Sequence, residues 1–385
     1  MVKNTLKFGL IVVTAFAAST AGRAQTAATA PKPAAQTAPA PRPAATAPAT
    51  AAASGWTKKT PWGDPDLQGT WNNGTATPMA RDPKYGTRLE LTKEELIDAT
   101  RNAAVRQEGE TEEQRSNGRG VGAGPTFWYE IGKPIPHTSL LIDPPDGRMP
   151  ALTAEAQAQM AARAKVLEEI PLDARLWTRQ GQWVRCISRG VPGGMVPVVY
   201  NNNYQIVQAP GYVVIFQEMV HLPRIVPLDG RARLDPAIKQ WNGSARGHWE
   251  GNTLVVETTN FAPDAELMDH GPGLMGKDAK VTERFTRLSA NDLDYKLTVD
   301  APSVYTKPFT AQIPMSSIAA SDRIMEYACI EGDRSVPLTI TGLVSAKKNP
   351  QAASPAPARG GRGGGAPGAG GGRRGGGPAA PAGGE

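Results

Sequence analysis

Histidines and glutamates on predicted strands are the residues in this sequence best suited to acid–base chemistry. His248 lies between Arg246 and Glu250 at the start of a predicted strand, a place where loops often build functional sites. His221 stands three residues after Glu218, at a strand junction. A histidine changes charge near neutral pH and can transfer a proton. Structural hydrogen bonding at a strand end is an equally good interpretation of either histidine.

Four predicted strands each carry a glutamate in line with apolar residues: Glu218, Glu257, Glu283 and Glu326. Successive side chains of a strand face opposite sides, so inward-turned faces would bring several carboxylates together. Burial would raise the pKa of such a carboxyl and would require arginine counter-charges. Glu218 and Glu283 are therefore the candidate partners of His248 or His221. For any single glutamate, an exposed pair with arginine is favoured, because charged side chains are usually solvated.

Three consecutive asparagines between two tyrosines form a second group of candidate side chains. Amides can hydrogen-bond a sugar or a carboxamide while aromatic rings stack on it. A loop entering a strand explains the same residues and is slightly favoured, because Asn tolerates left-handed backbone geometry. The residues expected to contact a ligand, here and around His248, are Asn201, Asn202, Asn203, Tyr204, Arg246, Trp249 and Glu257.

Metal and cofactor motifs are missing from the sequence. The four histidines fall at irregular spacings without a His-x-x-x-His or His-x-His pattern, so we expect no metal site. The glycine-rich loop Gly190–Gly194 lacks the lysine of a phosphate loop, and no Gly-x-Ser-x-Gly elbow occurs. We therefore predict no cofactor and no α/β-hydrolase triad.

The two cysteines, Cys186 and Cys329, favour a disulfide. An export signal implies an oxidising compartment, in which a cysteine pair in the folded part tends to be oxidised. The alternative is two separate buried thiols, and a reactive nucleophilic cysteine is the least favoured interpretation.

Composition divides the chain into four segments. Residues 1–24 read as a signal peptide, with Lys3 and Lys7 before an apolar run. Residues 25–54 form an Ala/Pro-rich linker and residues 347–385 a disordered Gly/Arg-rich tail, because neither has apolar side chains to bury. Residues 55–346 remain as a β-rich globular domain, and the whole protein is expected in the periplasm or outside the cell.

Positive charge is concentrated at the two ends of the chain. The first 54 residues hold five cations and no acid, and the part from Lys347 holds six cations and one acid. Because the whole chain carries +6, the middle carries −4. We therefore expect no nucleic-acid binding by the domain. The cationic tail could contact anionic polymers of the cell envelope.

Two surface helices are predicted before the strands. Thr92-Lys-Glu-Glu95 is a capping box, and the helix that it begins should run to about Arg106. The second helix runs from Glu155 to Glu169 and stops at Pro171.

Short β-branched and aromatic stretches joined by tight turns dominate the rest of the domain. Turns at Pro210-Gly211 and Glu250-Gly251-Asn252 each predict a hairpin. The predicted strands are Ser139–Asp143, Tyr204–Gln208, Tyr212–Met219, Leu222–Pro227, Gly247–Glu250, Thr253–Thr259, Val281–Leu288, Leu293–Val299, Phe309–Met315 and Ile324–Cys329. The pattern predicts a mainly β fold, an antiparallel calycin-like barrel or sandwich with two peripheral helices.

Five segments resemble those of a large family of exported bacterial proteins. They are Pro65–Trp71, Ile142–Arg148, Tyr200–Ile206, Arg246–Phe261 and Glu283–Phe285. The resemblance covers most of residues 55–335 and implies an exported, β-rich single domain, without established catalytic residues. Gly69-Thr70-Trp71 also resembles the opening of lipocalins and calycins, where the tryptophan closes one end of the barrel.

Three functions remain open from the sequence. The first is a module that binds a small, partly apolar molecule in the mouth of a barrel. The second is a lyase, isomerase or hydrolase that uses histidine and glutamate for proton transfer. The third is a structural envelope protein attached by its tails. The sequence does not indicate the oligomeric state.

Overall fold

The computed structural model describes residues 55–108, 129–169, 182–183, 185–220, 222–262, 275–319 and 323–329. All of these residues belong to one compact unit, Pro48–Glu385. The predicted signal peptide (1–24), linker (25–54) and tail (347–385) lie outside the described residues, and so does His221. Among the helices of the described part, none has the length and apolar character that a membrane span requires.

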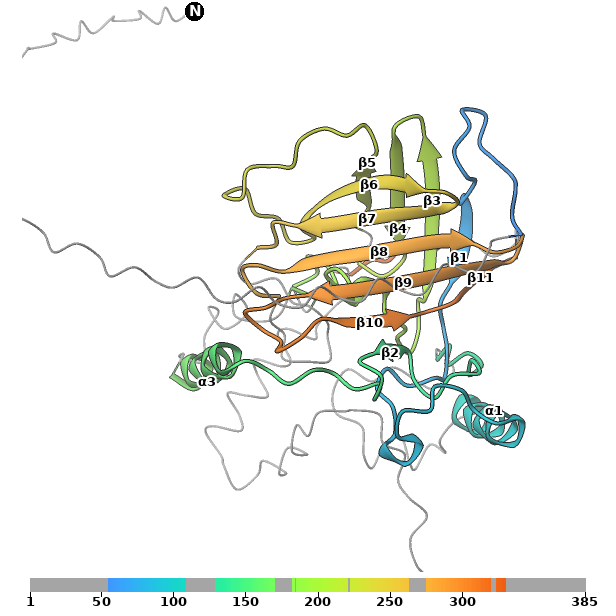
Figure 1. The fold of residues 1–385 in the computed structure, drawn as a ribbon, viewed down its shortest axis with the longest axis horizontal. Helices are drawn as coiled ribbons and strands as arrows, with labels where there is room; N and C mark the ends of the chain where they lie inside the picture. Colours follow the sequence, from blue (N-terminus) through green and yellow to red (C-terminus); the bar gives the residue numbers. More distant parts are fainter. Residues whose placement is uncertain are drawn as a thin grey trace, which may run out of the picture. The chain divides into compact units, whose positions relative to one another are not determined.

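One antiparallel sheet, nearly closed into a barrel, dominates the described residues (Figure 1). The strand order is β5-β4-β3-β1-β11-β9-β8-β7-β6, and β10 pairs with β9 and β2. The strands are β1 (Gly69–Asn72), β2 (Leu141–Asp143), β3 (Asn203–Ala209), β4 (Tyr212–Gln217), β5 (Arg224–Pro227), β6 (Ser244–Glu250), β7 (Thr253–Thr259), β8 (Lys280–Arg287), β9 (Asp292–Asp300), β10 (Phe309–Gln312) and β11 (Met315–Ser317). The predicted mainly β, calycin-like architecture is confirmed.

The two ends of the strand order, β5 and β6, contact each other without forming a ladder. Gly247 of β6 makes this contact possible. A Cβ atom at Gly247 would lie 2.6 Å from Leu228 Cδ2 and 2.8 Å from Val226 Cγ1, closer than real Cβ contacts. The sheet therefore curls back on itself where a missing side chain leaves room for the opposite strand.

Both predicted hairpins form, and glycines shape their turns. Gly211 follows Pro210 between β3 and β4 with a φ of 77°, as a turn with proline first and glycine second requires. Gly251 begins the two-residue loop between β6 and β7 with a φ of 59°. This left-handed φ matches the right-handed twist of paired strands and favours glycine.

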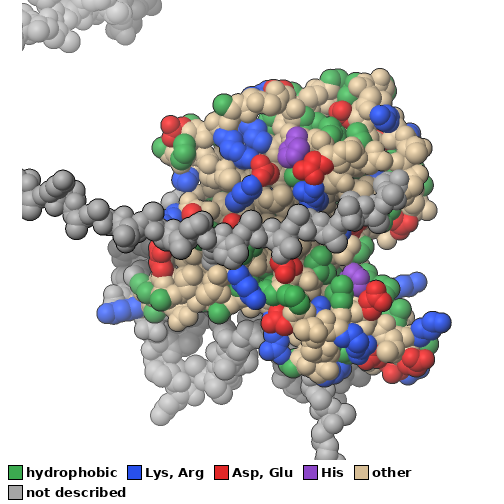
Figure 2. Space-filling model, viewed as in Figure 1, with side chains coloured by type: hydrophobic (Ala, Val, Ile, Leu, Met, Phe, Trp, Pro, Cys, Tyr) green, Lys and Arg blue, Asp and Glu red, His purple; other side chains and the backbone are tan. Residues whose placement is uncertain are grey.

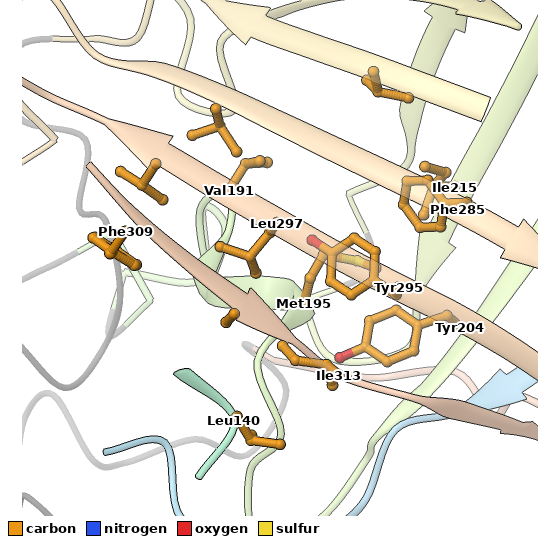
Figure 3. Close-up of a cluster of buried hydrophobic side chains, with 14 of the residues drawn as sticks. Leu140, Val191, Met195, Tyr204, Ile215, Phe285, Tyr295, Leu297, Phe309 and Ile313 are labelled. Atoms are coloured by element: carbon orange, nitrogen blue, oxygen red, sulfur yellow. The ribbon is translucent and has the colours of Figure 1, made fainter. Parts of the chain in front are cut away.

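Alternation along the strands separates a buried inner face from an outer face. On β8 the inward side chains include Val281, Glu283 and Phe285, all fully buried. The Phe285 ring lies 4.7 Å from that of Tyr295 on the neighbouring β9, centroid to centroid. Figure 3 shows this cluster, in which Met195 and Tyr204 lie beside Tyr295.

Trp71 of β1 is fully buried, as the Gly-x-Trp resemblance implies. Its indole Nε1 donates a hydrogen bond to the Leu67 carbonyl oxygen at 3.1 Å. The Arg287 guanidinium lies 4.9 Å from the centroid of the Trp71 ring and 4.0 Å from that of Trp56. Arg287 also donates to the backbone carbonyl oxygens of Gln68 and Ser289, which joins the end of β8 to the segment before β1.

The α-helices of the described residues are α1 (Lys93–Glu108) and α3 (Ala154–Glu169), and Figure 1 shows both outside the sheet. The capping box of α1 is present: Glu95 N donates to Thr92 Oγ1, and Thr92 N donates to Glu95 Oε2. Single 3-10 turns occur at Pro83–Tyr85 (η1) and Gly193–Met195 (η4).

Two predicted strands differ from the structure. The prediction of one strand over Phe309–Met315 is wrong, because Pro314 cannot donate to a ladder and separates β10 from β11. The prediction of a strand over Ile324–Cys329 is also wrong, since this segment has irregular backbone. Its residues alternate as in a strand, but the segment forms no ladder with any strand of the sheet.

Candidate functional site

A buried ion pair crosses the interior of the barrel. Arg224 of β5 donates from Nη1 to Glu283 Oε2 at 2.5 Å and from Nη2 to Glu283 Oε1 at 3.0 Å. The Tyr295 hydroxyl donates to Glu283 Oε1 at 2.8 Å. Glu283 and Tyr295 are completely buried, so water does not screen the pair.

The local electrostatics of this cluster follow from its burial. Burial works to lower the pKa of Arg224, but the charge and the hydrogen bonds of Glu283 outweigh it and raise that pKa. Burial and the charge of Glu283 raise the pKa of Tyr295 well above 10. The arginine therefore stays protonated and the phenol stays neutral, which suits a fixed charge pair.

Tyr204, which lies beside Met195 (Figure 3), and the buried Asn73 extend the polar interior. Asn73 Nδ2 donates to Met195 O at 2.8 Å and to the Tyr204 hydroxyl oxygen at 3.1 Å. Burial raises the pKa of Tyr204 to about 12. Tyr204 therefore contacts core side chains, away from any surface at which a sugar could stack on its ring.

Glu218 is buried directly after β4, and its hydrogen-bond partners differ from those of Glu283. Its Oε2 accepts from Asn203 Nδ2 at 2.8 Å, and its Oε1 accepts from the Met325 backbone N–H at 3.2 Å. Asn203 Oδ1 in turn accepts from Asn72 Nδ2 at 2.8 Å. This row of polar groups joins β1, β3 and the segment that contains Met325.

Asn201 and Asn202 shape the loop that enters β3. Asn201 has a left-handed φ of 56°. Asn202 is completely buried, and its side chain accepts from Val198 N at 2.8 Å and donates to Val198 O at 2.9 Å. These contacts match the structural interpretation of the asparagines as a loop entering a strand.

The residues around His248 lie on two faces of β6. His248 is exposed, and its Nε2 lies 3.2 Å from Glu250 Oε1. Arg246 donates to the carbonyl oxygens of Ala245 and Ala232 at 2.7 and 2.8 Å. Trp249 points the other way and packs against the core.

The remaining two candidate glutamates, Glu257 and Glu326, are not buried. Glu257 of β7 pairs with Arg233 at 2.6 Å and with Lys280. Burial works to raise the pKa of Glu257, but the hydrogen bond and the charge of Lys280 outweigh it and lower that pKa. Of the four glutamates in line with apolar residues, Glu283 and Glu218 are buried, and Glu283 is the one that pairs with Arg224.

The structure does not bring His248 together with Glu283. Arg284, the neighbour of Glu283, stands in the same cross-strand row as Val255 and His248, whereas Glu283 pairs with Val256. Because neighbouring residues of a strand face opposite sides, the sheet separates the histidine from the carboxylate. A direct proton transfer between them is therefore excluded by the fold.

A disulfide joins Cys186 and Cys329, as predicted, with the two Cα atoms 5.7 Å apart. It connects the loop before η4 to the irregular segment 323–329. The alternative of two separate thiols is thereby excluded.

A hollow with a volume of about 490 Å³ lies beside β1 and is lined in part by Trp71. Its two charged lining residues are both arginines, Arg287 and Arg323. Burial lowers the pKa of Arg287, against the effect of the Asp66 charge, so this cation is partly desolvated. The lining consists of Gly69, Thr70, Trp71, Gln205, Arg287, Ser317, Ile318, Ala319, Arg323 and Ile324.

None of these lining residues belongs to the site predicted from the sequence. Arg287 could have been found, because it shares a face with Glu283 in the strand pattern. No sequence pattern indicates Arg323 as a site residue, because it lies on a segment without regular secondary structure. A second hollow of about 360 Å³ lies over β8, β9 and β11 and is lined by acids as well as Lys296.

Within the described ranges, no group of histidine, cysteine, aspartate or glutamate side chains is arranged to hold a metal ion. The chain matches no family model. No curated protein matches it either. The chemistry of the hollow therefore carries the functional argument.

Proposed function

We propose that this protein is exported and binds a small, partly apolar molecule with an acidic group in the hollow beside β1. The observation that carries the proposal is the lining: two arginines and no acidic residue, next to the apolar side chains of Ile318 and Ile324. A volume of about 490 Å³ lies within the range of small-molecule sites.

Electrostatics favour an anion in this position. Arg287 is held by backbone carbonyl oxygens and by the Trp56 and Trp71 rings, and the negative charge of Asp66, which is not part of the lining, acts on it as well. A partly desolvated cation attracts an anion more strongly than a fully hydrated one. Arg323 adds a second positive charge to the same lining. A carboxylate or sulfonate would suit this pair, and a short hydrocarbon would suit the two isoleucines.

Export is part of the proposal because two features agree with it. Residues 1–24 carry the charge and apolar pattern of a signal peptide. The Cys186–Cys329 disulfide suits an oxidising compartment.

The enzyme alternative has less support than binding. The hollow contains no histidine or carboxylate in its lining, and the sheet separates His248 from Glu283. A structural envelope role is the outcome that remains if the hollow binds nothing.

Fluorescence titration with 8-anilinonaphthalene-1-sulfonate, a partly apolar anion, tests the proposal on the full mature chain. We expect saturable binding that Arg323→Gln weakens by about ten-fold, since a charge-assisted contact is lost. The matched control is Arg148→Gln, an exposed arginine outside the hollow, which should leave the affinity unchanged.

Competition defines the ligand chemistry. Hexanoate should displace the probe, whereas hexanol, which lacks the charge, and acetate, which lacks the hydrocarbon, should displace it much less. Equal displacement by hexanol would show that the arginines do not select an anion. Probe binding that is the same in the wild type and in Arg323→Gln would place the site elsewhere and overturn the proposal.

A further inference from the structure

The irregular segment 323–329, here named the strap, forms one side of the hollow. Arg323 and Ile324 at its beginning line the hollow, and Cys329 at its end carries the disulfide. The strap belongs to no ladder of the sheet. Its position therefore depends on a few discrete anchors instead of continuous strand pairing.

Among the described contacts, three connect the strap and the chain before it to the barrel and to the loop that carries Cys186. Upstream, the Ile318 N–H donates to Thr70 O at 3.1 Å, which fixes the exit from β11. In the middle, the Met325 N–H donates to Glu218 Oε1 at 3.2 Å. At the end, the disulfide ties Cys329 to Cys186, 143 residues away in sequence.

The acceptor of the middle anchor, the Glu218 carboxylate, is itself held in place by a residue of β3. Glu218 is buried, and its other oxygen is held by Asn203 Nδ2 at 2.8 Å. A single hydrogen bond makes only a modest net contribution to stability, because it replaces hydrogen bonds to water. It cannot by itself offset the conformational entropy of ordering a seven-residue segment. The disulfide adds a covalent anchor at the end of the strap, and we expect it to contribute most to holding the strap in place.

We infer that the Cys186–Cys329 disulfide is a redox switch for the hollow, an inference that rests on the proposed binding function. In the oxidised protein the disulfide holds the strap so that Arg323 lines the hollow. In the reduced protein the strap is released and ligand binding is weaker. The reductant is a dithiol: one thiolate attacks a disulfide sulfur, and the second thiolate resolves the mixed disulfide. The dithiol loses two electrons and becomes a disulfide, and each cysteine gains a proton.

The accessibility of the disulfide agrees with this chemistry. Neither cysteine residue is fully buried, which favours the approach of a small dithiol. Cys186 has a left-handed φ of 53°, an uncommon conformation for a non-glycine residue. The disulfide thus stands at a site where the local backbone has reason to relax once the covalent tie is broken.

The test titrates 8-anilinonaphthalene-1-sulfonate into the oxidised chain, the dithiothreitol-reduced chain and Cys186→Ser/Cys329→Ser. We expect about ten-fold weaker binding in both forms without the disulfide. In Arg323→Gln, the oxidised and reduced chains should bind the probe with affinities within about two-fold of each other. The variant lacks the guanidinium whose position the disulfide is proposed to control. Trypsin should also cut after Arg323 faster in the reduced chain.

The outcomes separate the switch from the proposed function. If the oxidised chain does not bind the probe, the binding function itself fails. If oxidised and reduced chains bind equally, binding stands and the switch is overturned. Unfolding on reduction, followed by circular dichroism, would make the disulfide purely structural and also overturn it.

A second pair of variants tests the strap without reducing agents. Met325→Pro removes the N–H that Glu218 accepts, whereas Met325→Ala keeps it. In the oxidised chain, Met325→Pro should weaken probe binding and Met325→Ala should not. Equal affinities in the two variants would show that the position of the strap does not matter for the hollow.

Discussion

Two neighbouring residues of β8, Glu283 and Arg284, form ion pairs on opposite sides of the same strand. Glu283 is completely buried and is held by Arg224 and Tyr295 inside the barrel. Arg284 lies on the outer face and pairs with Glu250, which is about half exposed. Figure 2 shows how Lys, Arg, Asp, Glu and His side chains intermingle on the surface of the molecule.

The surroundings of an ion pair, more than its chemistry, therefore set the free energy that is lost when the pair is broken. Outside, water already stabilises each charge, so pairing adds little. Inside, each charge has lost its water, and the partner must replace that stabilisation. The inner pair is therefore costly to break, although an apolar pair of similar volume could substitute for it. The following predictions are arranged around this contrast.

The largest effect is expected from Glu283→Ala. It leaves the Arg224 guanidinium buried without its carboxylate and should lower the free energy of unfolding by about 3–5 kcal/mol. Urea unfolding measures it. Arg284→Ala, the neighbouring outer-face variant, is the matched control and should cost less than about 1 kcal/mol. Similar losses in the two variants would contradict the contrast.

An alkaline pH dependence is expected from the interior. Burial raises the pKa of Tyr204 to about 12, from an ordinary value near 10. Below pH 10 the phenol is protonated in both states; between pH 10 and 12 only the unfolded chain ionises, so stability is lost as pH rises. Wild type should lose about 2 kcal/mol more over this range than Tyr204→Phe. Parallel stability curves from pH 10 to 12 would place Tyr204 in contact with solvent.

The double variant Arg224→Met/Glu283→Leu separates the cost of an orphaned charge from the worth of the pair. Apolar side chains of similar size need no water, so the double variant should differ from wild type by about 1 kcal/mol or less. It should therefore be more stable than Glu283→Ala alone, in the same urea measurement. A double variant as unstable as the single one would show that the inner pair makes a net contribution of its own.

The smallest effect is expected from Glu250→Gln on the outer face. Burial works to raise the pKa of Glu250, but the hydrogen bond with His248 and the charge of Arg284 outweigh it and lower that pKa. The stability that Glu250 contributes is present above the unfolded-state pKa of a glutamate and is lost as pH falls through the folded-state pKa. At neutral pH the variant should lose less than about 1 kcal/mol, and salt should reduce the difference further. Thermal unfolding in low and high salt measures this.

Much of the fold was predictable because it depends on local signals. The Pro210-Gly211 and Gly251 turns define two hairpins, and both form as predicted. The predicted strand Phe309–Met315 is interrupted at Pro314. A proline is also a local signal, because it cannot donate a hydrogen bond to a ladder. By contrast, no local rule says that Gly247 lies against β5, since that contact joins the two ends of the sheet.

The candidate site was predictable only in part. The strand pattern places Glu283 among apolar residues, and it is indeed inside. The same pattern equally suggested Glu257, which faces outward, and it paired His248 with a carboxylate that lies on the other side of the sheet. The sequence determines which residues share a face, but not which face is buried, because alternation alone is symmetric between the two.

The sequence by itself determined the mainly antiparallel β fold, the capped helix α1 and the two cysteines available for a disulfide. These features follow from neighbouring residues or from composition. Only the tertiary structure decided that Arg224 crosses the barrel to Glu283, and that Arg323 joins Arg287 at one hollow. Such contacts join segments far apart in the chain, and closure of the sheet sets their geometry, so no local pattern of residues encodes them.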